Sequence, residues 1–196
     1  MNIVLEWLDL TWKSSITKKL SKELWLKLIT KDMVSSVLWD IDNINDWEYI
    51  TKTLNLENNC VFDRHFLSLL VYWNLTNKDL YYSIIDEEKI FSDFLESNNW
   101  WIIVFRHHSY NFMKKKLDWR INNSTKELSQ HDLNMWDLDY FNKYCNTFHS
   151  VFNRFRRYNE SKERMVFAAK QDASKIFTKQ SVKTILYYHS KITNEK

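Results

Sequence analysis

Two clusters of basic side chains are the residues of this chain best suited to binding a polyanion. One comprises Arg106, Lys114, Lys115 and Lys116, and the other comprises Arg154, Arg156, Arg157, Lys162 and Arg164. The planar guanidinium of arginine matches the oxygens of a phosphate, and neighbours such as Phe155 and Tyr158 can stack on unpaired bases. The clusters therefore predict an RNA-binding surface whose affinity comes chiefly from phosphate contacts. The alternative is a solvated helix face with the aromatic side chains turned to the core.

The charge of the chain is unevenly distributed along the sequence. The 196 residues carry a net charge of +3. Residues 1–105 contain 10 Lys and Arg against 16 Asp and Glu, whereas residues 106–196 contain 18 against 9. We expect the basic half to contact a polyanion and the acidic half to pack on other proteins.

No arrangement of residues predicts catalysis or metal binding. The sequence has no glycine, which argues against the P-loop, the dinucleotide-binding fingerprint and the usual nucleophile elbow. The pairs His107–His108, His131–Asp132 and Cys145–His149 fit polar or half-buried positions better than a metal site, an acid–base pair or a nucleophile. We therefore expect a protein that is not an enzyme, with no catalytic residue, no metal, no cofactor and no small-molecule substrate.

The missing glycine and proline also bear on the fold. Glycine supplies the positive φ angles of tight hairpins, and proline punctuates turns. The sequence has neither, and Asn and Asp cluster instead at 40–46, 58–59, 74–77, 98–99 and 122–123. Since a helical protein needs only helix caps at such places, the composition predicts an all-α fold. No apolar run approaches the roughly 20 residues of a membrane-spanning helix.

Apolar spacing and cap residues predict an irregular bundle of about nine to eleven helices. A first helix is expected over 1–13, and a second is capped by Ser14 and Ser15. Further caps are expected at Asp63, Asp86, Ser109, Ser161 and Ser181, capping boxes at 45–48, 76–79 and 124–127, and a long helix over 138–158. Only 100–105 has the short, continuous, β-branched and aromatic character of a strand. Because a single strand would have no partner in such a bundle, a buried helical turn is the alternative for this segment.

The ten tryptophans are unexpected in a chain of this composition. Residues with AT-rich codons abound, whereas Gly, Pro and Ala, which have GC-rich codons, are absent or rare. Because the standard tryptophan codon carries two guanines, this pattern suggests an AT-rich genome in which TGA also encodes tryptophan, as in most mitochondria and in mollicutes. We therefore expect a mitochondrial, organelle-encoded protein, with a cytoplasmic protein as the alternative.

These observations favour a single helical domain over 1–196, with an acidic subdomain 1–105 and a basic subdomain 106–196. Its expected function is that of a non-enzymatic structural subunit of a large organellar assembly, in particular a mitochondrial ribosomal protein. Its partners would be other protein subunits and ribosomal RNA. The alternatives are a matrix-facing subunit of a respiratory or ATP synthase complex, and a viral or parasite helical module that binds a partner protein.

Overall fold

The computed structural model of the chain describes twelve helices and strands. The residues described are 2–7, 13–30, 33, 59–76, 86–96, 101–106, 109–123, 127–160, 166–168 and 177–194. In chain order the elements are β1 (Asn2–Trp7), α1 (Lys13–Leu24), β2 (Lys27–Ile29), β3 (Cys60–Asp63), α4 (Phe66–Thr76), α6 (Glu87–Glu96), β4 (Trp101–Arg106), α7 (Tyr110–Asn123), α8 (Gln130–Asn134), α9 (Leu138–Glu160), β5 (Val166–Ala168) and α10 (Phe177–Asn194).

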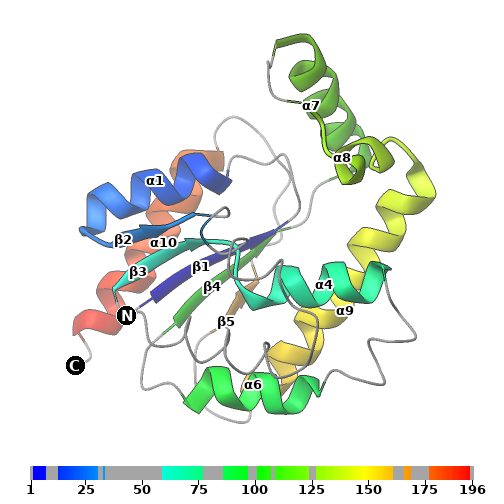
Figure 1. Cartoon of the computed structure of the whole chain (residues 1–196). Helices are drawn as coiled ribbons and strands as arrows, with labels where there is room; N and C mark the ends of the chain where they lie inside the picture. Colours follow the sequence, from blue (N-terminus) through cyan, green and yellow to red (C-terminus); the bar gives the residue numbers. More distant parts are fainter. Residues whose placement is uncertain are drawn as a thin grey trace.

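The strands form one parallel sheet in the order β2-β3-β1-β4-β5 (Figure 1). Consecutive parallel strands need crossover connections. In the described part of the chain, helices lie between β1 and β2, between β3 and β4, and between β4 and β5. The prediction of an all-α bundle of nine to eleven helices is therefore wrong. The strand-like segment expected at 100–105 is β4, and it pairs with β1 and β5 on its two sides.

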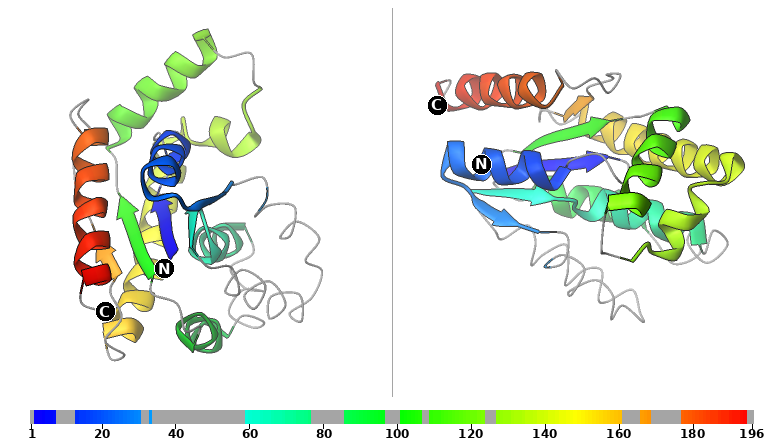
Figure 2. Two further views of the ribbon diagram at one scale, coloured as in Figure 1. Left: turned by 90° about the vertical axis from the view of Figure 1, so that its left-hand side faces the viewer. Right: turned by 90° about the horizontal axis from the view of Figure 1, so that it is seen from above.

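Helices cover both faces of the sheet, as the alternating side chains of β1 require. Ile3 and Leu5 are buried in one apolar cluster with Ile16 and Leu20 of α1. Val4 is buried in the other cluster, which includes Leu70 of α4. Two views show α1 and α10 on one side of the sheet, and α4, α6 and α9 on the other (Figures 1 and 2).

Several predicted helices are present, and their caps explain where they begin. The helices expected after Ser14, Asp63, Asp86 and Ser109, and the long one over 138–158, are α1, α4, α6, α7 and α9. Asp86 Oδ1 accepts from Lys89 N at 3.0 Å, and Ser109 Oγ accepts from Phe112 N at 3.3 Å. By contrast, the helix expected over 1–13 contains β1, and β5 lies where a helix was expected after Ser161. The capping boxes at 45–48, 76–79 and 124–127 fall mainly outside the described residues.

No helix among the described residues is both long and apolar enough to cross a membrane. The two cysteines, Cys60 and Cys145, are both buried free thiols.

Candidate phosphate site at the carboxyl edge of the sheet

The carboxyl ends of β1, β3 and β4 lie side by side at one edge of the sheet. Leu5 is paired in register with Asp63, and Trp7 with Arg106. The chain passes from β1 to strands on one side and later returns to β4 on the other side. Open parallel sheets bind their ligands outside the carboxyl ends of the strands, at such a change of direction.

The start of α1 meets the end of β3 at this edge. Lys13 is the first residue of α1, and five residues separate it from Trp7 at the end of β1. The hydroxyl of Ser14 donates a short hydrogen bond to Oδ2 of Asp63. The unpaired N–H groups and the dipole of a helix N-terminus attract anions. A hydroxyl, a carboxylate and a helix N-terminus therefore converge on one place.

Asp63 is buried, and one of its carboxylate oxygens can accept a further ligand. Its side chain is buried, and Oδ1 has no hydrogen-bond partner within the described part of the chain. A buried carboxylate oxygen without a partner is costly, and a cation can satisfy it. Oxygen ligands such as this carboxylate and the Ser14 hydroxyl are those that Mg²⁺ prefers. The residues at this edge thus fit a magnesium ion.

Glu6 connects β1 to the start of α4. Its Oε1 accepts from the backbone N–H of His65 at 2.8 Å and of Ser68 at 3.3 Å, and Oε2 accepts a short hydrogen bond from the Ser68 hydroxyl. Burial raises the pKa of Glu6 to about 7, although these hydrogen bonds and the charge of Arg64 act in the opposite direction. Glu6 therefore fixes the chain that immediately follows Asp63.

Arg64 adopts an uncommon backbone conformation next to Asp63. Its φ of 79° lies in the left-handed region, which costs a non-glycine residue free energy and often marks functional sites. Its guanidinium is buried, lies 5.6 Å from the centre of the Tyr72 ring, and donates to the Tyr72 hydroxyl at 3.3 Å. Burial lowers the pKa of the adjacent His65 to about 3, so this imidazole is neutral near pH 7. Arg64 is thus the cationic partner that the buried Glu6 carboxylate faces.

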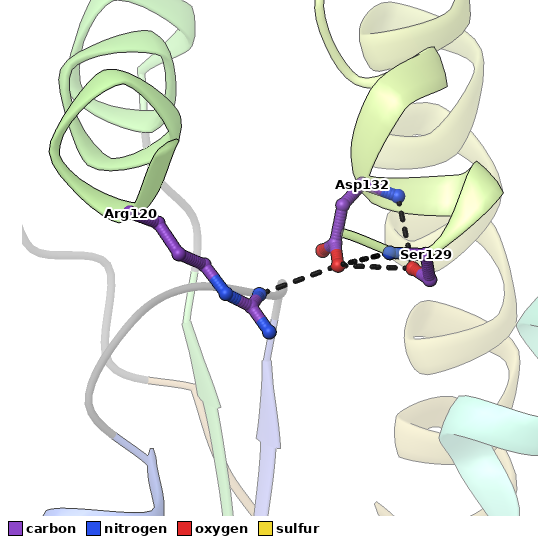
Figure 3. A network of polar contacts seen from close by, with 3 residues as sticks. All are labelled: Arg120, Ser129 and Asp132. Atoms are coloured by element: carbon purple, nitrogen blue, oxygen red, sulfur yellow. Dashed lines mark hydrogen bonds and ion pairs between the residues drawn. The ribbon is translucent and has the colours of Figure 1, made fainter. Parts of the chain in front are cut away.

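Helices α7 and α8 extend beyond the carboxyl ends of the strands (Figures 1 and 2). Arg120 of α7 reaches across to α8, where its NH1 lies 3.3 Å from Oδ2 of Asp132 (Figure 3). The same carboxylate accepts from the backbone N–H of Ser129 at 3.1 Å and from its hydroxyl at 2.9 Å. Asp132 therefore completes the capping box of α8 and joins the two helices.

The predicted RNA-binding residues are spread over several elements. Arg106 ends β4 at the carboxyl edge, and Lys114, Lys115 and Lys116 lie on α7. Arg154, Arg156 and Arg157 lie on α9, and Arg154 makes a two-pronged ion pair with Glu87 of α6. Lys162 and Arg164 lie outside the described residues. RNA binding by these residues stays a prediction.

Glu6 and Arg64 were not singled out in the sequence, and Ser14 and Asp63 were expected only as helix caps. One signal for them was present in the order of residue types. The phosphate-binding loop G-x-x-x-x-G-K-[ST] lies between a strand and a helix. Here Trp7, Trp12, Lys13 and Ser14 have that spacing, with tryptophan at both glycine positions. Because the motif is recognised by its glycines, their absence concealed it. Of the candidate pairs, His107–His108 lie outside the described residues, His131–Asp132 lie on α8 and Cys145–His149 on α9. Burial raises the pKa of Cys145 to about 12.

Comparison with solved structures places this arrangement in a known fold. The Bacillus subtilis YorR protein, in complex with phosphorylated GDP, superposes with a TM-score of 0.66 at 21% identity, over 97% of this chain and 96% of that chain. The chain has a nucleotide-kinase-like P-loop fold. Deoxyadenosine kinase from M. mycoides, with dCMP and dCDP bound, gives a TM-score of 0.57 at 15% identity, over 98% of this chain and 100% of that chain. Thymidylate kinase from Candida albicans gives 0.57 at 12%, over 100% and 93%. No protein-family model and no curated protein sequence matches the chain.

These comparisons overturn the expected function. The fold is shared with kinases, so the prediction of a non-enzymatic structural subunit, and of a mitochondrial ribosomal protein in particular, is wrong. The expectation of no small-molecule substrate is wrong for the same reason, since the neighbours bind nucleotides. A mitochondrial location stays a prediction.

Proposed function

We propose that this protein transfers a phosphoryl group from a nucleoside triphosphate to a nucleoside or a nucleoside monophosphate. The observation that carries the proposal is the hydrogen bond between Ser14, at the start of α1, and Asp63, at the end of β3. P-loop enzymes hold Mg²⁺ with the Ser or Thr of the loop and an Asp from a neighbouring strand. The nucleotide kinases among the structural neighbours support the acceptor class.

Each group at the edge has a role in this proposal. Lys13 occupies the position whose ammonium reaches the β- and γ-phosphates in a P-loop. Ser14 and Asp63 would hold Mg²⁺, which neutralises and orients the phosphate oxygens when it is bound. The N-terminus of α1 offers its backbone N–H groups to the same phosphates. Phosphoryl transfer needs mainly positioning and compensation of charge, and these residues supply both.

The uneven charge of the sequence has a second interpretation in this setting. Arg106 ends β4 beside Trp7, and α7 with its lysines lies beyond the carboxyl ends of the strands. Side chains of this kind raise the local concentration of a polyphosphate. The polyanion expected from the sequence would then be a nucleotide and not RNA.

A phosphoryl-transfer assay tests the proposal. The chain is made as it stands and as the Trp7→Gly/Trp12→Gly variant, because tryptophan occupies both glycine positions of the loop. Each form receives ATP or GTP labelled in the γ-phosphate, Mg²⁺, and a panel of nucleosides and nucleoside monophosphates. We expect transfer to at least one acceptor by the glycine form. Absence of transfer by both forms to every acceptor would refute the proposal.

A matched pair of substitutions locates the activity. In the active form, Asp63→Asn should lower kcat by about 100-fold or more, since it removes a charge that compensates the transition state. Asp139→Asn makes the same chemical change on an exposed side chain in the first turn of α9 and should leave kcat unchanged. Equal rates for the two variants would place the site elsewhere.

A further inference from the structure

Three tryptophans occupy positions at which either the observed backbone conformation or the spacing of a known motif calls for glycine. The clearest is Trp25, which directly follows the last residue of α1 and has a φ of 55°. Leu26 N donates to Ser21 O at 3.1 Å across this residue. That bond is the 6→1 bond of a Schellman motif, in which the left-handed residue is usually glycine.

Within the described part of the chain, no packing of the Trp25 side chain compensates for its conformation. The left-handed region is unfavourable for a residue with a Cβ. The Trp25 side chain is 93% exposed, so burial of the indole does not offset the unfavourable backbone conformation. The other two described residues with positive φ differ from it: Asn59 is of a type that tolerates this region, and Arg64 lies in the candidate site.

The other two are Trp7, the last residue of β1, and Trp12, the residue before α1 in the sequence. Together with Lys13 and Ser14 they match G-x-x-x-x-G-K-[ST] at every fixed position except the two glycines. Those glycines let the backbone turn tightly and approach the phosphates. The inference for Trp7 and Trp12 rests on the proposed function, whereas the inference for Trp25 does not.

We infer that the codons for Trp7, Trp12 and Trp25 are translated as glycine in the organism that makes this protein. A codon such as TGA, whose meaning differs between genetic codes, would place tryptophan at every one of these sites when it is read under the wrong code. One reassignment then accounts for the unexpected number of tryptophans in a chain that has no glycine. It also gives residues 7–14 the sequence of a complete phosphate-binding loop.

Peptide mass spectrometry of the protein isolated from its own organism tests the inference directly. Trypsin cleaves after Lys13, Lys22 and Lys27, so the peptides 1–13 and 23–27 contain all three positions. We expect the masses for glycine at 7, 12 and 25. Masses for tryptophan at these positions would overturn the inference, whether or not the protein transfers phosphate. Glycine masses in a protein that shows no phosphoryl-transfer activity would support this inference and contradict the proposed function.

A matched pair of variants tests the structural argument separately. Trp25→Gly should raise the Tm of the recombinant chain, because it relieves the left-handed conformation and loses little burial. Trp119→Gly removes another exposed indole but places glycine inside α7, and it should lower the Tm. A fall in Tm for Trp25→Gly as large as that for Trp119→Gly would remove the support that Trp25 gives to the inference.

Discussion

At the scale of single residues, the buried carboxylate of Glu6 is the group most sensitive to pH. Its folded-state pKa of about 7 is higher than its ordinary value of 4.5, because burial disfavours the charged form. Arg64 faces it as a cation, and His65 beside it is neutral over the same range. The stability that protonated Glu6 contributes is therefore complete below about pH 4.5 and is lost as the pH rises through 7.

We expect Glu6→Gln to flatten this pH dependence. Between pH 5 and 8 the free energy of unfolding of the unmodified chain should fall relative to that of the variant. The fall should be about 3 kcal/mol at most, which is the free energy that corresponds to the difference between the folded-state and ordinary pKa of Glu6. Denaturant titrations at several pH values measure this difference. Glu23→Gln, at an exposed position of α1, should leave the pH dependence as it is. Parallel pH profiles for the chain and Glu6→Gln would contradict the assignment to Glu6.

The residues of the candidate site could be found from the sequence only in part. Arg106 was selected for its charge, and it does lie at the carboxyl edge. Asp63 was interpreted only as a cap of the following helix, since nothing in a single sequence shows that Cys60–Asp63 is a strand next to β1. The pairing of Ser14 with Asp63 joins residues that are far apart along the chain, and it depends on the sheet.

At the scale of elements, helices were easier to predict than strands. Caps such as Asp86 and Ser109 act over three residues, so that they are visible in the sequence. Residues 3–5 of β1 are buried between helices on both faces, which makes the strand a continuous apolar run without alternation. Such a run cannot be told from a buried helix by periodicity alone. Strand β5 has three residues, too few to show any period.

The ion pair between Arg154 and Glu87 joins α9 to α6. Nε lies 2.5 Å from Oε2, NH2 lies 2.6 Å from Oε1, and the Glu87 side chain is 15% exposed. A two-pronged, partly buried pair is stronger than an ordinary surface pair. This contact gives Arg154 a structural role that the exposed Arg157 on the same helix does not show.

We expect Arg154→Met to lower the free energy of unfolding by about 1–2 kcal/mol, and Arg157→Met by less than about 0.5 kcal/mol. In a double-mutant cycle with Glu87→Gln, the coupling energy between the two residues should account for most of the free energy of unfolding that Arg154→Met removes. Chemical denaturation of the four variants supplies the values. A coupling energy near zero would show that the pair contributes nothing to the packing of α6 on α9.

At the scale of the whole molecule, the absence of glycine led the sequence interpretation away from the fold. A parallel α/β sheet with helical crossovers needs few hairpins, so that it can form with little glycine. The composition argued against tight turns, and helices lie in three of the strand connections that the structure describes, those from β1 to β2, β3 to β4 and β4 to β5. The same absence concealed the spacing of Trp7, Trp12, Lys13 and Ser14, which is that of a phosphate-binding loop.

The central claim is that nucleotide phosphates bind at the carboxyl edge of the sheet, between the start of α1 and the end of β3. Amide hydrogen exchange of the Trp7→Gly/Trp12→Gly chain, with and without Mg²⁺ and a non-hydrolysable ATP analogue, measures this most directly. We predict slower exchange at the start of α1 and over 63–68 when the nucleotide is present, and no such change in the Asp63→Asn variant. Protection confined to α9 around Arg154–Arg157, or no protection at any nucleotide concentration, would contradict it.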